Sequence, residues 1–220
     1  MKVIAVIPAR DAAATVGDVV RGLRRVLPSA EVIVVDDGSM DATGERSREA
    51  GAAVVRHEVN RGKGAALESG FAEALRRGAD AVIAMDADGQ HDPAAAPNLL
   101  ASLEGADLVV GSRERDRTGM PLLRRATNDV TTWLVSLLAG QRIHDSQSGY
   151  RAIRSSVLRT VHPRSRRFEY ESEFLIAAAR AGFSIGEAPV PTLYNAPGSH
   201  IDPVRDTLRF IRLVIRHIGR

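Results

Sequence analysis

Two aspartates, Asp86 and Asp88, have the side-chain type and the spacing needed to hold a metal ion. They follow an apolar run, one residue apart, and Gln90 comes two residues later. Two carboxylates at a strand end can both reach a hard cation such as Mg²⁺ or Mn²⁺, and an amide can add a neutral oxygen. Such a metal would bridge a diphosphate and stabilise the charge on a departing phosphate. The alternative is a solvated turn, because Asp-x-Asp also arises by chance.

A second acidic pair, Asp36 and Asp37, opens an Asp-Gly-Ser turn after another apolar run. Adjacent carboxylates can accept hydrogen bonds from a base N–H and a ribose hydroxyl. The alternative is a turn in which Asp41 caps the next helix. We predict a structural role for Asp41. We predict a ligand role for Asp37 first and for Asp36 second.

Two glycines and two cations lie together in Asn60-Arg61-Gly62-Lys63-Gly64, at the start of a predicted helix. Helix N-termini bind anions through free N–H groups. Contact with a phosphate and plain loop geometry both fit this segment. It is not a P-loop, because the pattern G-x-x-x-x-G-K-[ST] is absent.

The first half of the chain alternates apolar strands with helices. Strands are predicted at Lys2–Ala9, Glu31–Asp36, Ala53–His57, Ala81–Asp86 and Leu108–Ser112, and helices at 14–27, 42–50, 64–77 and 94–104. This alternation predicts an α/β fold, a mostly parallel sheet with helices on both faces. Ligands of such sheets bind beyond the carboxyl ends of the strands, and all three polar clusters fall there.

The alternation stops after about residue 115. We expect a helix at 121–139, a loop at 141–150, a helix at 170–181, a strand near 184–193 and a last helix at 203–218. The acidic side chains of Glu169, Glu171 and Glu173 suit the dipole at the start of a helix. The organisation predicted is one domain over residues 1–200 and a basic amphipathic helix over 201–220.

Composition narrows the class of protein. The chain has 220 residues, 44% of them hydrophobic, and no cysteine, which excludes disulfides and thiol chemistry and fits a reducing cytosol. We expect no signal peptide and no membrane-spanning helix. Residues 1–110 carry 12 basic and 17 acidic side chains, and residues 111–220 carry 18 and 10. An acidic half suits metal binding and a basic half suits phosphates or an anionic surface.

Several enzyme classes lack their motifs here. No G-x-G-x-x-G follows the first predicted strand, which argues against a nicotinamide dehydrogenase, and no G-x-S-x-G indicates a hydrolase. The acidic pair follows the second strand and not the first, unlike a phosphoacceptor receiver domain. A sugar-nucleotide pyrophosphorylase would need a Gly-rich, Arg-containing loop after the first strand, which is missing.

Three motifs in order resemble the family 2 inverting glycosyltransferases, and most nearly the polyprenyl-phosphate sugar transferases such as dolichyl-phosphate mannosyltransferase. The resemblance spans roughly residues 2–195. It rests on Asp36-Asp37-Gly38-Ser39-x-Asp41-x-Thr43, Asp86-x-Asp88-Gly89-Gln90-His91-x-Pro93 and Ser148-Gly149-Tyr150-Arg151. It implies a Rossmann-like, nucleotide-sugar-binding fold of the GT-A type, with residues 1–200 as the catalytic domain.

The resemblance also implies roles for individual residues. The nucleotide would be held by Pro8, Ala9, Asp36, Asp37, Lys63 and Asp86, and Mg²⁺ or Mn²⁺ by Asp86, Asp88 and Gln90. The acceptor side would be lined by Ser148, Gly149, Tyr150 and Arg151. The catalytic residues would be Asp88, Asp145, Arg113 and Arg125, with the two arginines facing the phosphates of donor or acceptor.

A phosphate acceptor is favoured on chemical grounds. An alcohol acceptor needs a base to remove its proton, whereas a phosphate monoester is already largely anionic at neutral pH, its second pKa being about 6. Electrostatic holding by the Arg-rich second half would then suffice. Asp145 fits either a base or orienting group or a loop carboxylate paired with an arginine.

We expect none of the membrane helices that many relatives carry, and two segments could replace them. Residues 203–218 carry an arginine stripe and an apolar stripe, typical of a helix lying on an anionic bilayer. Residues 120–139, with Trp133, could be a second membrane-touching face. Packing of the last helix on the domain, and anchoring by a membrane-bound partner, are the alternatives.

We therefore predict a cytoplasmic enzyme, peripheral on the cytoplasmic membrane face. It would move a hexose, mannose or glucose, from a GDP- or UDP-linked sugar to a polyprenyl (dolichyl or undecaprenyl) phosphate with inversion, and would bind no nucleic acid. The alternatives are a family 2 transferase with a soluble acceptor and a catalytically idle nucleotide-sugar-binding protein.

Overall fold

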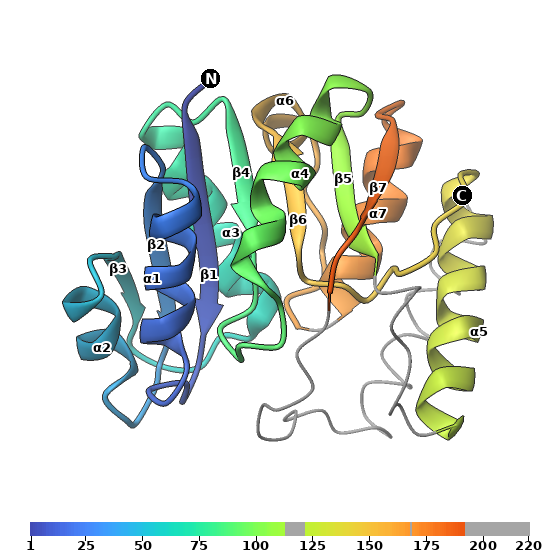
Figure 1. Ribbon diagram of the computed structural model, residues 1–220. Helices are drawn as coiled ribbons and strands as arrows, with labels where there is room; N and C mark the ends of the chain where they lie inside the picture. The colour runs from blue at the N-terminus through green and yellow to red at the C-terminus, as the bar shows by residue number, and fades with distance from the viewer. Residues whose placement is uncertain (113–121, 168, 192–220) are drawn as a thin grey trace.

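The computed structural model describes residues 1–112, 122–167 and 169–191, with residues 122–127 as backbone only (Figure 1). Its seven strands form one sheet in the order β3-β2-β1-β4-β6-β5-β7. The strands are β1 (Val3–Ala9), β2 (Glu31–Asp37), β3 (Ala53–His57), β4 (Ala81–Ala84), β5 (Leu108–Ser112), β6 (Arg151–Arg154) and β7 (Ile185–Pro189). All run parallel except β6, which is antiparallel to both of its neighbours.

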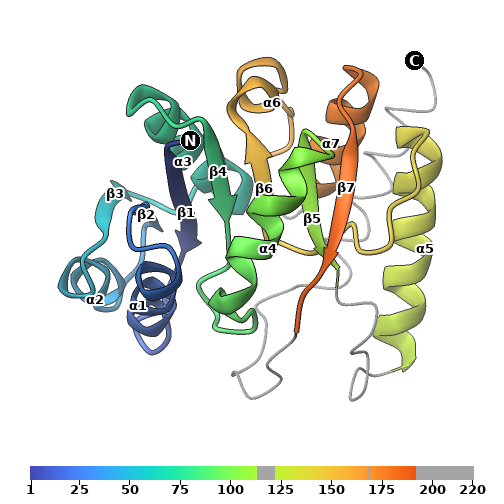
Figure 2. The same cartoon turned by 45° about the horizontal axis from the view of Figure 1, so that its top comes forward.

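Helices cover both faces of the sheet, as Figures 1 and 2 show. One face carries α1 (Val16–Val26), α2 (Thr43–Glu49) and α4 (Ala96–Ala101), with the short 3₁₀ turns η1 (Pro93–Ala95) and η2 (Ser102–Glu104). The other carries α3 (Lys63–Arg76), α5 (Leu122–Ala139), α6 (Ser155–Thr160) and α7 (Glu169–Arg180). Alternate strand residues therefore feed two separate cores, which explains why the central strands are apolar on both faces.

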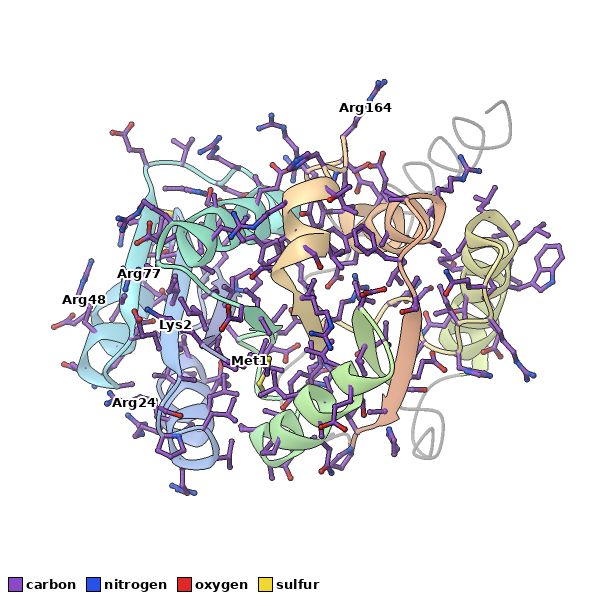
Figure 3. All side chains as sticks on the ribbon, turned by 90° about the horizontal axis from the view of Figure 1, so that it is seen from above. Met1, Lys2, Arg24, Arg48, Arg77 and Arg164 are labelled. Atoms are coloured by element: carbon purple, nitrogen blue, oxygen red, sulfur yellow. The ribbon has the colours of Figure 1, made fainter. Side chains whose placement is uncertain are left out.

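Different residues gather at the amino ends and at the carboxyl ends of the parallel strands, which are called here the amino edge and the carboxyl edge of the sheet. Figure 3 looks onto the amino end, where Lys2 and Arg77 both pair with Glu31 at 2.9 Å. The opposite, carboxyl edge carries the loops that follow β1, β2, β3 and β4. The acidic clusters predicted from sequence lie in these loops.

The predicted mostly parallel sheet is confirmed, as are the predicted helices that fall within the described residues, with two differences. The helix expected at 94–104 is three short pieces, η1, α4 and η2. The sequence prediction missed β6 and α6 altogether. The sequence of β6, Arg-Ala-Ile-Arg, is four residues with a cation at each end, so it lacks the apolar run that predicts a strand.

Some predictions fall outside the described residues. Arg113 and residues 201–220 lie there, so the division at residue 200 stays a prediction. Within the described part of the chain, no helix has the length and apolar character needed to cross a bilayer.

Candidate active site

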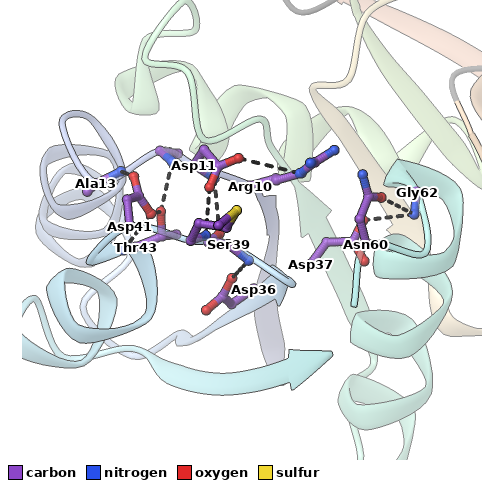
Figure 4. A network of polar contacts seen from close by, with 12 residues as sticks. Arg10, Asp11, Ala13, Asp36, Asp37, Ser39, Asp41, Thr43, Asn60 and Gly62 are labelled. Carbon is purple, nitrogen blue, oxygen red and sulfur yellow. Dashed lines mark hydrogen bonds and ion pairs between the residues drawn. The ribbon is translucent and has the colours of Figure 1, made fainter. Parts of the chain in front are cut away.

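The loops after β1 and β2 are joined by a network of polar contacts (Figure 4). Asp36 is fully buried, accepts the N–H of Ser39 at 2.9 Å and pairs with Arg56 at 2.8 Å. The Ser39 hydroxyl in turn accepts the N–H of Asp11 at 3.0 Å. Pro8 and Ala9, at the buried end of β1, pair with Val35 and Asp36 of β2. The first two loops thus form one fixed wall of the edge.

Asp37 fixes the loop that follows β3. Its carboxylate accepts the N–H groups of Arg61 and Gly62, each at 2.8 Å, and lies 2.7 Å from Nδ1 of His57. His57 Nε2 lies 2.9 Å from the hydroxyl of Ser69 on α3. These contacts fix the backbone of the residues that directly precede Lys63.

Gly38 and Asp41 shape the turn after β2. Gly38 has φ +70°, and a Cβ there would lie 2.6 Å from the backbone nitrogen of Asn60, so only glycine fits. Asp41 accepts the N–H of Thr43, the first residue of α2, and that of Ala13, both at 3.0 Å. The structural role predicted for Asp41 is confirmed.

Lys63 lies between two carboxylates at the centre of the edge. Its ammonium is 2.7 Å from Asp86 Oδ1 and 3.3 Å from Glu171 Oε2. Burial lowers the pKa of Lys63, but the charges of Asp86 and Glu171 outweigh burial and raise it above its ordinary value. A fixed cation therefore lies beside the first aspartate of the Asp-x-Asp motif.

Asp88 and Gln90 complete the predicted metal-binding set. Both are partly exposed, like Asp86, and the Gln90 N–H donates to Asp88 Oδ1 at 3.0 Å. No group of three or more His, Asp or Glu side chains poised for a metal occurs among the described residues. By chemical type, two carboxylates and an amide oxygen suit Mg²⁺ or Mn²⁺, and Mg²⁺ takes few protein ligands when substrate phosphates and waters supply the rest.

Gly149 brings the Ser-Gly-Tyr-Arg segment against the Asp-x-Asp motif. A Cβ on Gly149 would lie 2.5 Å from Asp86 Oδ2, so the close approach of the 148–151 backbone to the carboxylate leaves no room for a side chain at this position. Ser148 beside it is fully buried. Two motifs more than 60 residues apart in sequence thus meet at one point.

The side chains of Tyr150 and Arg151 point into the protein. Tyr150 is fully buried and donates to the Pro93 carbonyl at 3.3 Å. The Arg151 guanidinium donates to the carbonyls of Ser146, Ser148 and Glu171, each at 3.0 Å. In this structure both side chains hold the 148–151 segment in place, and contact of this segment with an acceptor stays a prediction.

The remaining predicted catalytic residues are placed less fully. Asp145 is 8% exposed. Burial lowers the pKa of Arg151, and the negative charge of Asp145 is close enough to raise it in part. Arg125 belongs to α5, where only its backbone is described, and Arg113 lies outside the described residues. Their catalytic roles stay predictions.

Glu171 is the site residue that the sequence prediction missed. It was assigned with Glu169 and Glu173 to the helix dipole, yet Glu171 is 6% exposed and Glu173 is 3% exposed. A signal was available, since Glu171 stands three and four residues before Phe174 and Leu175, on the apolar face of α7.

Residues 4–161 match Glycosyl transferase family 2. The chain belongs to this family. It is 33% identical to the undecaprenyl-phosphate mannosyltransferase of Micrococcus luteus, with 86% of this chain and 83% of the relative covered. It is also 33% identical to the UDP-N-acetylglucosamine–dolichyl-phosphate N-acetylglucosaminyltransferase of Methanococcus voltae, with 74% and 75% covered.

Among solved structures, the family 2 chain is similar to glucosyl-3-phosphoglycerate synthase from Mycobacterium tuberculosis in complex with Mn²⁺, uridine diphosphate and glucosyl-3-phosphoglycerate. The TM-score is 0.75 at 25% identity, and the match covers 99% of this chain and 78% of that one. The predicted family and the GT-A fold are confirmed, and the protein is a glycosyltransferase.

Proposed function

We propose that this glycosyltransferase moves a hexose from a GDP- or UDP-linked sugar to a polyprenyl phosphate, with inversion and by direct displacement. An acceptor phosphate oxygen forms the new bond to the anomeric carbon as the bond to the nucleoside diphosphate breaks. The names of the curated relatives support a lipid-phosphate acceptor. The single observation that carries the proposal is the close approach of Gly149 to Asp86, where a Cβ would lie 2.5 Å from Oδ2, because it supports a donor and an acceptor meeting at this point.

On the donor side, the loops after β1 and β2 offer the wall for the base and ribose. The Lys63 ammonium faces the diphosphate. Asp86, Asp88 and Gln90 would hold Mg²⁺ or Mn²⁺, which when bound supplies positive charge for the departing diphosphate. Mn²⁺ in the similar synthase structure supports this cofactor.

On the acceptor side, a phosphate monoester needs no base to become a nucleophile at neutral pH. Asp145 then serves to orient the loop through its charge on Arg151, and Arg113 and Arg125 hold the acceptor phosphate. The exposed apolar ridge of α5, formed by Val130, Trp133 and Leu137, supports contact with a lipid surface. The proposed location is the cytoplasmic face of the membrane.

A donor and acceptor screen tests the proposal. Purified protein with Mg²⁺ or Mn²⁺ and a short-chain polyprenyl phosphate is incubated with labelled GDP-mannose, UDP-glucose or UDP-N-acetylglucosamine in turn. Label entering the organic phase from one donor is the expected result. Donor binding with no turnover on any acceptor would instead indicate an idle nucleotide-sugar-binding protein.

A soluble acceptor is the second proposed function. The similarity to a glucosyl-3-phosphoglycerate synthase over 99% of this chain favours it. Including 3-phosphoglycerate in the same screen separates the two. Label that stays in the aqueous phase, attached to this acceptor, would replace the lipid proposal with the soluble one.

A further inference from the structure

Glu171 and Asp86 hold the same ammonium from two sides. The side chains of Lys63, Asp86 and Glu171 are 17%, 22% and 8% exposed, so the ion pairs are largely shielded from water. Asp86 belongs to the β4 loop and Glu171 to α7, and Lys63 begins α3. Three elements distant in sequence therefore converge on one charge.

Backbone contacts fix the start of α7 against the start of α3. The N–H of Ala65 donates to the Arg166 carbonyl at 3.1 Å, and a Cβ on Gly64 would lie 2.6 Å from the side chain of Tyr170. The Glu171 carbonyl accepts Arg151 Nη1 at 3.0 Å. Glu171 is thus anchored on a rigid frame, whereas Lys63 has a flexible four-carbon stem.

A buried carboxylate near an anion-binding site weakens binding of the anion unless another interaction of the carboxylate compensates. Glu171 adds negative charge close to where the diphosphate would bind, which by itself weakens donor binding. Its contact with Lys63 offers the compensation, because an ammonium held in one place loses less side-chain entropy when it meets a ligand. Positioning and simple charge therefore predict opposite effects of removing Glu171.

We propose that Glu171 is a positioning residue that holds the Lys63 ammonium beside Asp86, where it meets the donor diphosphate. This inference rests on the proposed function, since it concerns the donor of that reaction. Glu171 acts through Lys63 and does not contact the donor itself.

The test is a double-mutant cycle on nucleotide affinity. UDP and GDP are titrated into the full chain with Mn²⁺ by calorimetry, using wild type, Glu171→Gln, Lys63→Met and the double variant. Glu171→Gln should weaken binding of the nucleotide that wild type prefers by about tenfold. In the Lys63→Met background the same change should have no further effect.

Glu173→Gln is the matched control, a buried glutamate two residues along α7 that accepts the N–H of Ser165 at 2.8 Å. Its effect on affinity should be absent in both backgrounds. If Glu171→Gln does not fold, Glu171→Asp is used in the same cycle, since the shorter side chain also withdraws the carboxylate from Lys63.

The outcomes separate this inference from the proposed function. A wild type that binds neither UDP nor GDP would contradict the proposed function. A wild type that binds, with Glu171→Gln unchanged or tighter, would overturn the positioning role. Losses from Glu171→Gln and Lys63→Met that simply add would overturn it too.

Discussion

At the scale of single residues, Asp86 and Asp88 have the same side chain but different surroundings. Asp86 is paired with Lys63 and packed against Gly149, whereas Asp88 accepts one backbone N–H, that of Gln90. The charge of Lys63 opposes a metal at Asp86 Oδ1, so the proposed cation depends chiefly on Asp88. The two aspartates therefore have separable roles.

Asp88→Ala should abolish most sugar transfer while the protein stays folded. A metal contributes several kcal/mol to stabilising a leaving diphosphate, and each 1.4 kcal/mol is a factor of ten, so a loss of about a hundredfold or more is expected. Transfer is measured against Mn²⁺ concentration, with thermal melting as the check on folding. Asp80→Ala, at the amino end of β4, is the control. Full turnover by Asp88→Ala would contradict the metal assignment.

At the scale of elements, the site depends on how closely the 148–151 segment approaches the loop after β4. Gly149→Ala would place a Cβ 2.5 Å from Asp86 Oδ2, so the carboxylate or the loop must move. Overpacking of this kind costs about 1–3 kcal/mol, and we expect kcat/KM to fall by about tenfold or more. Gly105→Ala is the matched control, because a Cβ there meets nothing within 4 Å. Equal activity of both variants would exclude a functional contact at Gly149.

A second element-scale prediction concerns acid stability at the end of α3. Hydrogen bonds from Arg76 and Arg77 lower the pKa of Glu73 to about 2, and Arg77 also pairs with Glu31 of β2. A carboxyl whose pKa falls on folding stabilises the fold above its unfolded pKa of about 4.5 and loses that contribution as pH falls toward 2. Urea unfolding of wild type and Glu73→Gln should therefore differ most near neutral pH and converge by pH 2. A difference that stays constant with pH would contradict this.

The same scale explains what could be predicted from sequence. Strands β1, β2, β4 and β5 are continuous buried apolar runs, and β3 is a short, partly buried run. Parallel topology alone puts Asp37 and Asp86 at the same, carboxyl ends of the strands. β6 gave no such signal, because the side chains of Arg151 and Arg154 donate to backbone carbonyls and do not form part of an apolar run. Glu171 was missed because its partner Lys63 is 108 residues away, a pairing that only the folded chain reveals.

At the scale of the whole molecule, the acidic and basic halves of the sequence correspond to the two substrates of the proposed reaction. Residues 1–110 carry the acidic motifs of the proposed donor side, and residues 111–220, with 18 basic and 10 acidic side chains, carry the proposed acceptor side. On the described part of that second half, α5 presents Val130, Trp133 and Leu137 at 58%, 63% and 64% exposure. Their spacing places them on one helix face, while Val135 and Ala139 face the core.

This apolar ridge should hold the enzyme on lipid if the acceptor is a polyprenyl phosphate. Burying two large apolar side chains is worth roughly 2 kcal/mol each, so Trp133→Ser with Leu137→Ser should weaken binding to anionic vesicles at least about tenfold. Vesicle sedimentation measures this, and UDP or GDP affinity should not change. Met40→Ser, at a 96% exposed apolar residue after β2, is the control for vesicle binding only, because its loop belongs to the proposed wall for the base and ribose. The double variant should lose transfer to polyprenyl phosphate in vesicles more than to a water-soluble short-chain acceptor, because only the former requires the surface. Unchanged vesicle binding and transfer would contradict the role of the ridge in membrane binding.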